Sequence, residues 1–292
     1  MMLLTKLNRD YPQRLPQPIS NGRIVNASIR LAVGAALLSL SILLPSAAQQ
    51  PTPPAPEANQ LLRRALSVLS ANSITHDVTL SGTAHYTVGP DDETGTATLK
   101  AIVTGASRID LMLPSGPRIE VRNLGANVPV GTWSGPDGVD HAIPYHNLLN
   151  EPSWFSPVAS ISRLLASPES AASFVSTETI DSQSVQHISV TQQAPQSVAS
   201  AEPSFLPHLT QIDFYLDSAT SLPAAITFDI HPDNDALIDI PIEVRFSDYR
   251  PVNGTQIPFH VQKFLNHGLI LDLQFESATI NSGLSATALA IQ

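Results

Sequence analysis

The chain has 292 residues, of which 42% are hydrophobic, enough for one sizeable core, and its formal net charge is −10. Residues 1–48 hold five basic side chains against one acidic side chain, a net +4, so the remainder carries −14. Binding to nucleic acid or to an anionic lipid surface needs clustered lysine and arginine, and no such stripe follows residue 48. The absence of cysteine excludes disulfides, thiolate metal sites and a cysteine nucleophile.

The first 48 residues have the pattern of a signal peptide. Residues 31–44 form an apolar run, preceded by Arg30 and followed by the small residues Ser46, Ala47 and Ala48. A helix that spans a bilayer needs about 20 apolar residues, so a signal cleaved after Ala48 is favoured over an N-terminal anchor. Residues 49–58 contain four prolines and are predicted to form an extended linker. We therefore expect an exported, periplasmic protein that touches the inner membrane only if this segment is not cleaved.

Two helices are predicted in the rest of the chain. Residues 59–69 place leucines at helical spacing behind Asn59, a suitable N-cap. Residues 151–166 repeat large apolar side chains every three or four positions, with Pro152 in the expected first turn. Each apolar stripe needs a partner, and a sheet face is the natural one.

Strands are predicted for most of the remaining sequence. Apolar and polar residues alternate through 77–123, in a short hairpin at 132–143, and in segments at 172–179, 186–191, 210–216 and 224–230. The clearest pattern is 238–275, where three alternating segments are separated by Asn253-Gly254 and by Asn266-His267-Gly268, residues that suit tight turns. The sequence predicts a mainly β protein of about eleven antiparallel strands with one or two helices. A single domain is expected at 59–282, followed by a loose tail at 283–292.

Four aromatic side chains lie close together in a chain poor in aromatics. Trp133, Tyr145, Trp154 and Phe155 are the predicted ligand-binding residues, because large aromatic side chains supply much of the surface in apolar ligand sites. The alternative is ordinary packing between the second helix and the sheet.

Two histidine-containing segments carry residue types that can bind metal ions. His141 and His146 occur near Asp137 and Asp140, ligand types that zinc prefers, but their spacing does not place both imidazoles on one helix face. Residues 231–235, HPDND, are rich in oxygen, yet they lack the glycine and the distal glutamate of an EF-hand loop. A hydrogen-bonded loop and a solvated acidic turn are the favoured interpretations, so no metal is predicted.

Motifs for catalysis are also missing from the sequence. There is no G-x-S-x-G elbow, no S-x-x-K and no phosphate-binding glycine loop. We therefore predict no catalytic residue, no cofactor and no enzyme activity.

Several segments resemble the LolA/LolB/RseB-like periplasmic proteins. Residues 61–69 resemble the first helix of that group, and 77–86 (DVTLSGTAHY) resemble its first strand. Residues 214–223 (FYLDSATSLP) and 246–260 (FSDYRPVNGTQIPFH) resemble two of its recurring hairpins. The resemblance implies a curved antiparallel sheet, a half-barrel of about eleven strands covered by helices. It also implies a hydrophobic concave face, because the carriers of this group bind acyl chains or lipoproteins there.

These observations give one leading hypothesis and two alternatives. The leading hypothesis is an exported, non-enzymatic protein that binds a lipophilic ligand or a lipid-bearing protein in the concave half-barrel, with residues 131–150 and the second helix as a lid. The first alternative is a filled-core module that recognises a partner protein at the cell envelope. The weaker alternative is a metal-assisted hydrolase that uses His141 and His146.

Overall fold

The computed structural model describes residues 58–71, 73–126, 128–193 and 205–290. The predicted signal or anchor at 1–48 and the linker up to residue 57 lie outside the described residues. The division of the chain into these segments and a domain at 59–282 therefore stays a prediction. Within the described ranges, no helix is both long enough and apolar enough to cross a membrane.

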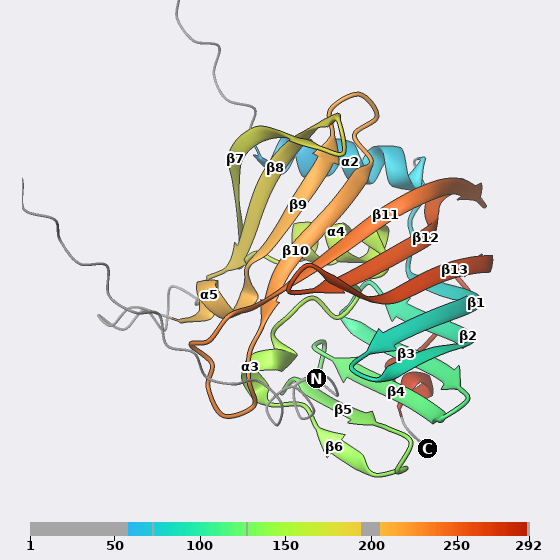
Figure 1. The fold of residues 1–292 in the computed structure, drawn as a ribbon. Coiled ribbons are helices and arrows are strands. Elements are labelled where there is room, and N and C mark those ends of the chain that lie inside the picture. Colours follow the sequence, from blue (N-terminus) through green and yellow to red (C-terminus); the bar gives the residue numbers. More distant parts are fainter. Residues whose placement is uncertain (1–57, 72, 127, 194–204, 291–292) are drawn as a thin grey trace, which may run out of the picture. The chain divides into compact units, whose positions relative to one another are not determined.

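Thirteen antiparallel strands of the described chain form one curved, unclosed sheet (Figure 1). The strands are β1 (Asp77–Val88), β2 (Asp91–Ile102), β3 (Ala106–Leu113), β4 (Gly116–Asn123), β5 (Val130–Ser134), β6 (Asp140–Ala142), β7 (Ser170–Ile180), β8 (Gln183–Gln192), β9 (Ile212–Asp217), β10 (Pro223–Ile230), β11 (Ile240–Val252), β12 (Thr255–Leu265) and β13 (Gly268–Ile280). This confirms the prediction of a mainly β protein with a curved antiparallel sheet, with thirteen strands in place of about eleven.

The sheet consists of two meanders joined along one seam. Its strand order is β6-β5-β4-β3-β2-β1-β13-β12-β11-β10-β9-β8-β7, so neighbours in the sheet are neighbours in sequence except at β1 and β13. Those two strands pair antiparallel, with Val78 opposite Ile280 and Tyr86 opposite Leu271. The long connection from β6 to β7 joins the two outer edges of the sheet.

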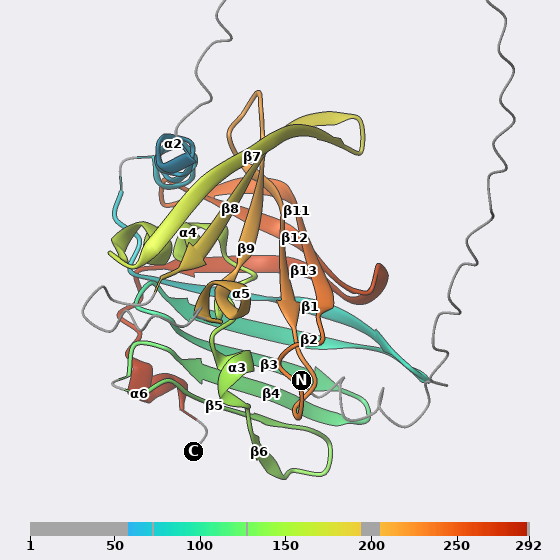
Figure 2. The same cartoon turned by 90° about the vertical axis from the view of Figure 1, so that its left-hand side faces the viewer.

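Two of the five described helices cover the concave face of this sheet. The described helices are α2 (Ala58–Ser70), α3 (Tyr145–Leu148), α4 (Pro157–Ala166), α5 (Leu206–Thr210) and α6 (Ala286–Leu289). α2 packs against α4 and contacts both β7 and β12, two strands that lie well apart in the sheet order. In Figure 2, α2 and α4 lie together inside the curve of the sheet.

One continuous core lies between these helices and the sheet. The predicted alternation holds in β11, where Ile242, Val244 and Phe246 are buried and the residues between them are not. The inward side chains of β1 to β3 and β8 to β13 join the buried faces of α2 and α4 in a single hydrophobic cluster. Burial of apolar surface on this scale is the main term that stabilises such a sheet.

The second helix is shorter than predicted. We expected a helix over 151–166, but α4 begins at Pro157, and Ser156 before it is extended (φ −129°, ψ 90°). Proline disfavours the helical conformation of the residue before it, and its own missing N–H suits the first helical position. The periodicity of 151–156 therefore belongs to a segment of turns that packs its aromatic residues without being helical.

The C-terminal end is not the loose tail that we expected. α6 forms at residues 286–289, and Leu289 is 1% exposed in a small cluster with Ile102 and Ala106. The Arg108 guanidinium also donates to the carbonyl oxygens of Leu289 (3.3 Å) and Ala290 (3.0 Å). A single buried leucine and a charged donor are enough to dock this short segment on β3.

A buried carboxylate fastens the start of β1 to the chain that follows β13. Asp77, 2% exposed, accepts hydrogen bonds from the backbone N–H groups of Ser282, Gly283 and Leu284 and from the Ser282 hydroxyl. Burial opposes ionisation, but these donors lower the pKa of Asp77 below its usual value. The carboxylate therefore satisfies several donors that would otherwise be left without partners.

We expect Asp77→Ala to lower the free energy of unfolding by about 1–3 kcal/mol, because three backbone N–H groups and the Ser282 hydroxyl lose a buried acceptor. The measurement is chemical denaturation of both proteins. Asp217→Ala is the matched control, since Asp217 also accepts from two backbone N–H groups and a hydroxyl, but in an exposed turn. Equal losses in the two variants would contradict a special role for Asp77.

Candidate functional site

A pocket of about 90 Å³ lies on the concave face of the sheet and contains both tryptophans of the sequence. It is lined by strands from both meanders and by one residue of the β6–β7 connection, Trp154. The lining residues are Tyr86, Ile109, Leu111, Arg118, Ile119, Glu120, Trp133, Ser134, Trp154, Lys263, Ile270 and Leu271. The pocket is therefore mainly apolar, with three charged side chains among its walls.

The seam between the two meanders builds this pocket. Tyr86 on β1 lies opposite Leu271 on β13, and Leu271 lies opposite Lys263 on β12. The next pair is Phe264 with Leu269, so Ile270 is an extra, bulged residue. The bulge changes the alternation of β13, so that Ile270 is buried in the pocket wall while Leu269 is 36% exposed.

A partly buried charge cluster forms one side of the pocket. The Arg122 guanidinium donates to Glu120 (2.7 Å) and to the carbonyl oxygen of Asn147 in α3 (2.7 Å). Burial opposes ionisation of Glu120, but Arg122 holds the pKa of that carboxyl well below its usual value. Burial lowers the pKa of Lys263 from 10.5 to about 8, although the Glu120 carboxylate favours the ammonium form. At neutral pH the cluster therefore contains a carboxylate, a guanidinium and an ammonium group.

Two buried donors in the pocket walls lack partners. The Trp154 indole Nε1 and the Arg118 Nε have no hydrogen-bond partner among the described residues. The rest of Arg118 is engaged, through Ser115 Oγ (2.8 Å), Asp91 (3.1 Å) and the face of Tyr86 (4.6 Å to the ring centroid). Buried donors normally find a partner. A ligand with a carbonyl or anionic oxygen is one way in which these two could be satisfied.

The segment that carries Trp154 is tied to α4. Glu151, with a fully buried side chain, pairs with Arg163 of α4 and accepts from the Ser153 N–H (3.0 Å). The Ser160 hydroxyl of α4 donates to the Ser153 carbonyl (3.1 Å). On its other side, the Trp154 ring faces the sheet through Lys263, whose Nζ lies 4.3 Å from the ring centroid. Trp154 is thus held from α4 and placed over the pocket.

The four predicted ligand residues have different surroundings. Trp133 and Trp154 line the pocket, and Trp133 also stacks on His141 with 4.3 Å between ring centroids. Phe155 is fully buried in the core and meets Trp154 edge to face. Tyr145 begins α3, is 59% exposed and is not among the residues that line the pocket. Their role in binding stays a prediction.

The charged residues of the pocket were missed, although the sequence carried a signal. Lys263 follows Ile257, Phe259 and Val261 at intervals of two, so it occupies a position on the buried face of its strand. Arg118, Glu120 and Arg122 likewise share one face of β4. A lysine at a position on the buried face of a strand indicates either an ion pair or a binding site.

The two candidate zinc ligands, His141 and His146, lie in separate surroundings. His141 is beside Trp133 and 3.7 Å from Asp137, whereas His146 Nε2 donates to the Pro232 carbonyl (3.0 Å). Within the described ranges, the group of three or more potential metal ligands that converges is instead His208, His231 and Asp239. The arrangement gives no support to a hydrolase built on His141 and His146.

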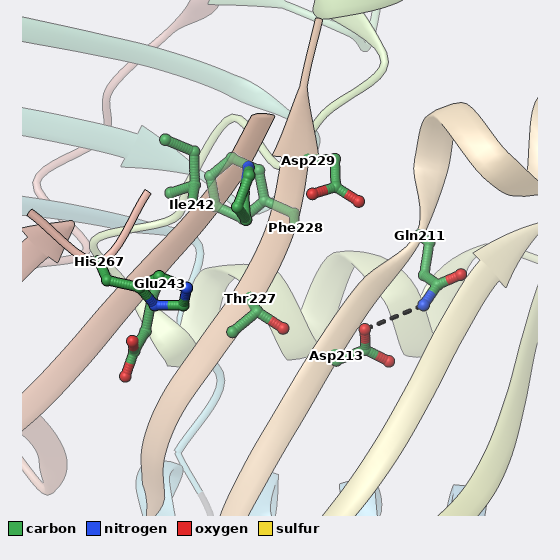
Figure 3. Close-up of a pocket in the computed structure, with 9 residues that line it drawn as sticks. Gln211, Asp213, Thr227, Phe228, Asp229, Ile242, Glu243 and His267 are labelled. Atoms are coloured by element: carbon green, nitrogen blue, oxygen red, sulfur yellow. Dashed lines mark hydrogen bonds between the residues drawn. The ribbon is translucent and has the colours of Figure 1, made fainter. Parts of the chain in front are cut away.

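A second hollow, of about 220 Å³, lies on the outer face of β9 to β11 (Figure 3). Asp213, Asp229 and Glu243 are among the residues that line it, and a Gln211 amide donates to Asp213 (3.0 Å). Burial, followed by the nearby Asp239 carboxylate, raises the pKa of Asp229. An acidic hollow of this kind is unsuited to an acyl chain, so the concave pocket is the better candidate for a lipophilic ligand.

The lowered pKa of Lys263 predicts a pH-dependent stability. Between pH 8 and 10.5 this lysine is mostly neutral in the folded chain and still protonated in the unfolded chain. The unfolded state then binds more protons, so rising pH favours the folded state. We expect the unfolding free energy of the unmodified chain to increase relative to Lys263→Met across this range, as measured by denaturation at several pH values. Lys100→Met corrects for losing a lysine outside the pocket, and a constant difference would contradict the prediction.

No family model and no curated protein matches this chain. Among solved structures, it is similar to a domain named for outer-membrane lipoprotein sorting from Vibrio parahaemolyticus, with 12% identity, a TM-score of 0.50, and coverage of 80% of this chain and 97% of that chain. A LolA superfamily protein from Nitrosomonas europaea is 10% identical, with coverage of 80% and 97% and a TM-score of 0.49. A DUF1329 family protein from Desulfovibrio piger is 12% identical, with coverage of 80% and 95% and a TM-score of 0.48. At these identities the likeness concerns the fold alone, and the resemblance noted from the sequence is confirmed at that level: the chain has a LolA-like fold.

Proposed function

We propose that this chain is a non-enzymatic carrier that binds the acyl part of an amphiphile, a lipid or a lipid-bearing protein, on the concave face of its sheet. One observation carries the proposal: an apolar pocket whose walls include two tryptophans also holds two buried donors without partners. The LolA-like fold and the lipoprotein-sorting name of a structural neighbour support the same reading. The signal-like residues 1–48 place the carrier in the periplasm in this proposal.

The pocket would take the polar end of the acyl chain and its first methylene groups. Each buried methylene contributes about 0.8 kcal/mol to binding. Lys263 supplies a positive charge beside the Trp154 ring, and the free N–H groups of Trp154 and Arg118 offer hydrogen bonds to a carboxylate or ester oxygen. This combination favours an acidic or ester-linked head over an uncharged alcohol.

The size of the pocket requires a moving cover. Pockets for drug-sized ligands measure about 300–1,000 Å³, several times the 90 Å³ found beneath Trp154. A longer chain would enter only if residues 151–156 withdraw from β12 and β4. The lid in this proposal is therefore the segment that carries Trp154, together with α4.

A second function is favoured by the same small volume. The interior beyond the pocket is one packed hydrophobic cluster, as expected of a filled-core module that recognises a partner protein. The two functions differ in whether the concave face takes up a lipid.

Native mass spectrometry of the purified full chain, followed by organic extraction and lipid analysis, separates them. We expect a lipid in stoichiometric amount, displaced from Trp154→Ala but retained by Phe205→Ala, which removes an aromatic side chain that is 64% exposed and does not line the pocket. Circular dichroism of Trp154→Ala would verify that the variant is folded. A protein free of lipid after gentle purification would move the assignment to the interaction module.

The two tryptophans make a direct binding assay possible, because no other tryptophan in the sequence contributes fluorescence. We expect laurate, a C12 carboxylate, to change the tryptophan emission with a lower Kd than dodecanol, the uncharged alcohol of equal length. Calorimetry should show that Lys263→Met weakens laurate binding about 3- to 10-fold, the value of one charge-assisted contact, and leaves dodecanol unaffected. The preference for laurate should decline above about pH 8, where Lys263 loses its proton.

Tyr145→Ala tests the remaining sequence prediction in the same assay. Because Tyr145 is exposed and does not line the pocket, we expect laurate to bind this variant as it binds the unmodified chain. Equal affinity of the unmodified chain for laurate and dodecanol would contradict the role given to Lys263. No response to either ligand would contradict the carrier function itself.

A further inference from the structure

Three potential metal ligands converge at one end of β10 and β11, away from the concave pocket. His231 follows β10, Asp239 precedes β11, and His208 lies in α5. One ligand atom from each lies within 4.8 Å of the other two. His208 Nε2 is 3.2 Å and His231 Nδ1 is 3.4 Å from the same carboxylate oxygen of Asp239.

The pairing of β10 with β11 brings His231 and Asp239 together. Ile230 of β10 lies opposite Ile240 of β11, so His231 and Asp239 occupy the next positions outward on the two paired strands. The loop between them can vary without separating the two side chains. α5 ends just before β9, the other neighbour of β10, and this brings His208 to the same end of the sheet.

His231 is held rigidly and has an unused ring nitrogen. Its backbone N–H donates to the Asn147 side chain (2.9 Å), and its carbonyl accepts from the same amide (2.7 Å). Nδ1 lies 3.1 Å from the Ile238 carbonyl oxygen. A carbonyl only accepts, so Nδ1 carries the proton there and the neutral ring keeps a lone pair on Nε2.

In this protonation state the ring nitrogen available to an ion is Nε2, not the Nδ1 atom that lies 3.4 Å from Asp239. His231 is fully buried, and its Nε2 has no hydrogen-bond partner within the described ranges. Metal-bound histidines usually donate their other ring N–H to a backbone carbonyl or carboxylate, which is the contact that His231 Nδ1 makes with Ile238. His208 and Asp239 are exposed, so their side chains are free to adjust toward an ion.

The surroundings favour a cation. Asp229, two residues before His231, adds a carboxylate on the wall of the outer hollow in Figure 3. A third imidazole, His146, lies with its ring centroid 6.0 Å from that of His231.

We propose that His208, His231 and Asp239 form a binding site for a divalent first-row transition metal such as Zn²⁺. Two imidazoles and one carboxylate are a ligand set that these ions prefer, whereas Ca²⁺ takes six to eight oxygen ligands. With three protein ligands, a fourth position stays open to water or to a further group. The site links α5 to the β10 and β11 ends and shares no lining residue with the concave pocket.

The test uses the untagged full chain after removal of metal with a chelator. Calorimetric titration with Zn²⁺ should show one ion bound per chain. His208→Ala and Asp239→Asn, both at exposed positions, should each weaken binding at least about tenfold, because the loss of supporting partners alone has effects of this size. Zn²⁺ should also raise the melting temperature of the unmodified chain, since a ligand of the folded state stabilises it.

A matched control comes from another exposed histidine–aspartate pair. His85 Nε2 lies 2.6 Å from Asp92 on the β1–β2 hairpin, and no third ligand from the described part of the chain converges there. His85→Ala should leave the Zn²⁺ affinity within about twofold of the unmodified chain. The proposal is overturned if the chain binds no Zn²⁺ at millimolar concentration, or if His208→Ala and Asp239→Asn bind as tightly as His85→Ala.

Discussion

The pairing of β1 with β13 is the constraint on which the rest of this structure depends. It joins residues as far apart in the sequence as Val78 and Ile280, a separation of 202 positions, and turns two separate meanders into one sheet. Gly82 lies in this seam, where a Cβ atom would come within 2.1 Å of the Gln274 carbonyl oxygen. The concave pocket exists only because of the seam, since Tyr86 comes from one meander and Lys263 from the other.

The connection between the two sheet edges is the second organising element. It leaves β6 through α3, crosses the concave side with Trp154, and continues as α4 toward β7. Asn147 in α3 joins the two sites of the molecule. Its carbonyl oxygen accepts from Arg122 beside the concave pocket, and its side-chain amide bonds the backbone of His231 in the proposed metal site. The same short helix therefore positions groups at both sites.

The sequence predicts much of the sheet, because the signals for hairpins are local. Asn253-Gly254 and Asn266-His267 adopt the positive φ angles that their residue types suggested. The features that escaped prediction depend on distant contacts. The bulge at Ile270 is defined only against β12, and Leu289 docks only because β3 offers it an apolar contact. The sequence alone does not show which distant residues come into contact.

The candidate sites also combine features with a local sequence signal and features that depend on distant contacts. Lys263 could be found from its phase in β12, since it continues the buried positions of that strand. His231 and Asp239 could be placed together once the β10–β11 hairpin was recognised, because they extend its last pair. Their contact with His208 could not be predicted, because α5 reaches them across β9. The proximity of Glu120 and Lys263 in one pocket was equally hidden, because it crosses the β1–β13 seam.

The way in which Trp154 is held bears on how the pocket could open. Its segment is bonded to α4 through the buried Glu151–Arg163 pair and the Ser160 hydroxyl, and removing one partner of a buried ion pair is costly. Its contacts with the sheet are apolar packing in the core and the cation–π interaction with Lys263, neither of which is a buried ion pair. If the pocket opens, the break should therefore occur between Trp154 and the sheet, with the segment and α4 moving as one unit. A ligand anion that draws Lys263 away from the ring would weaken the contact that closes the pocket over it.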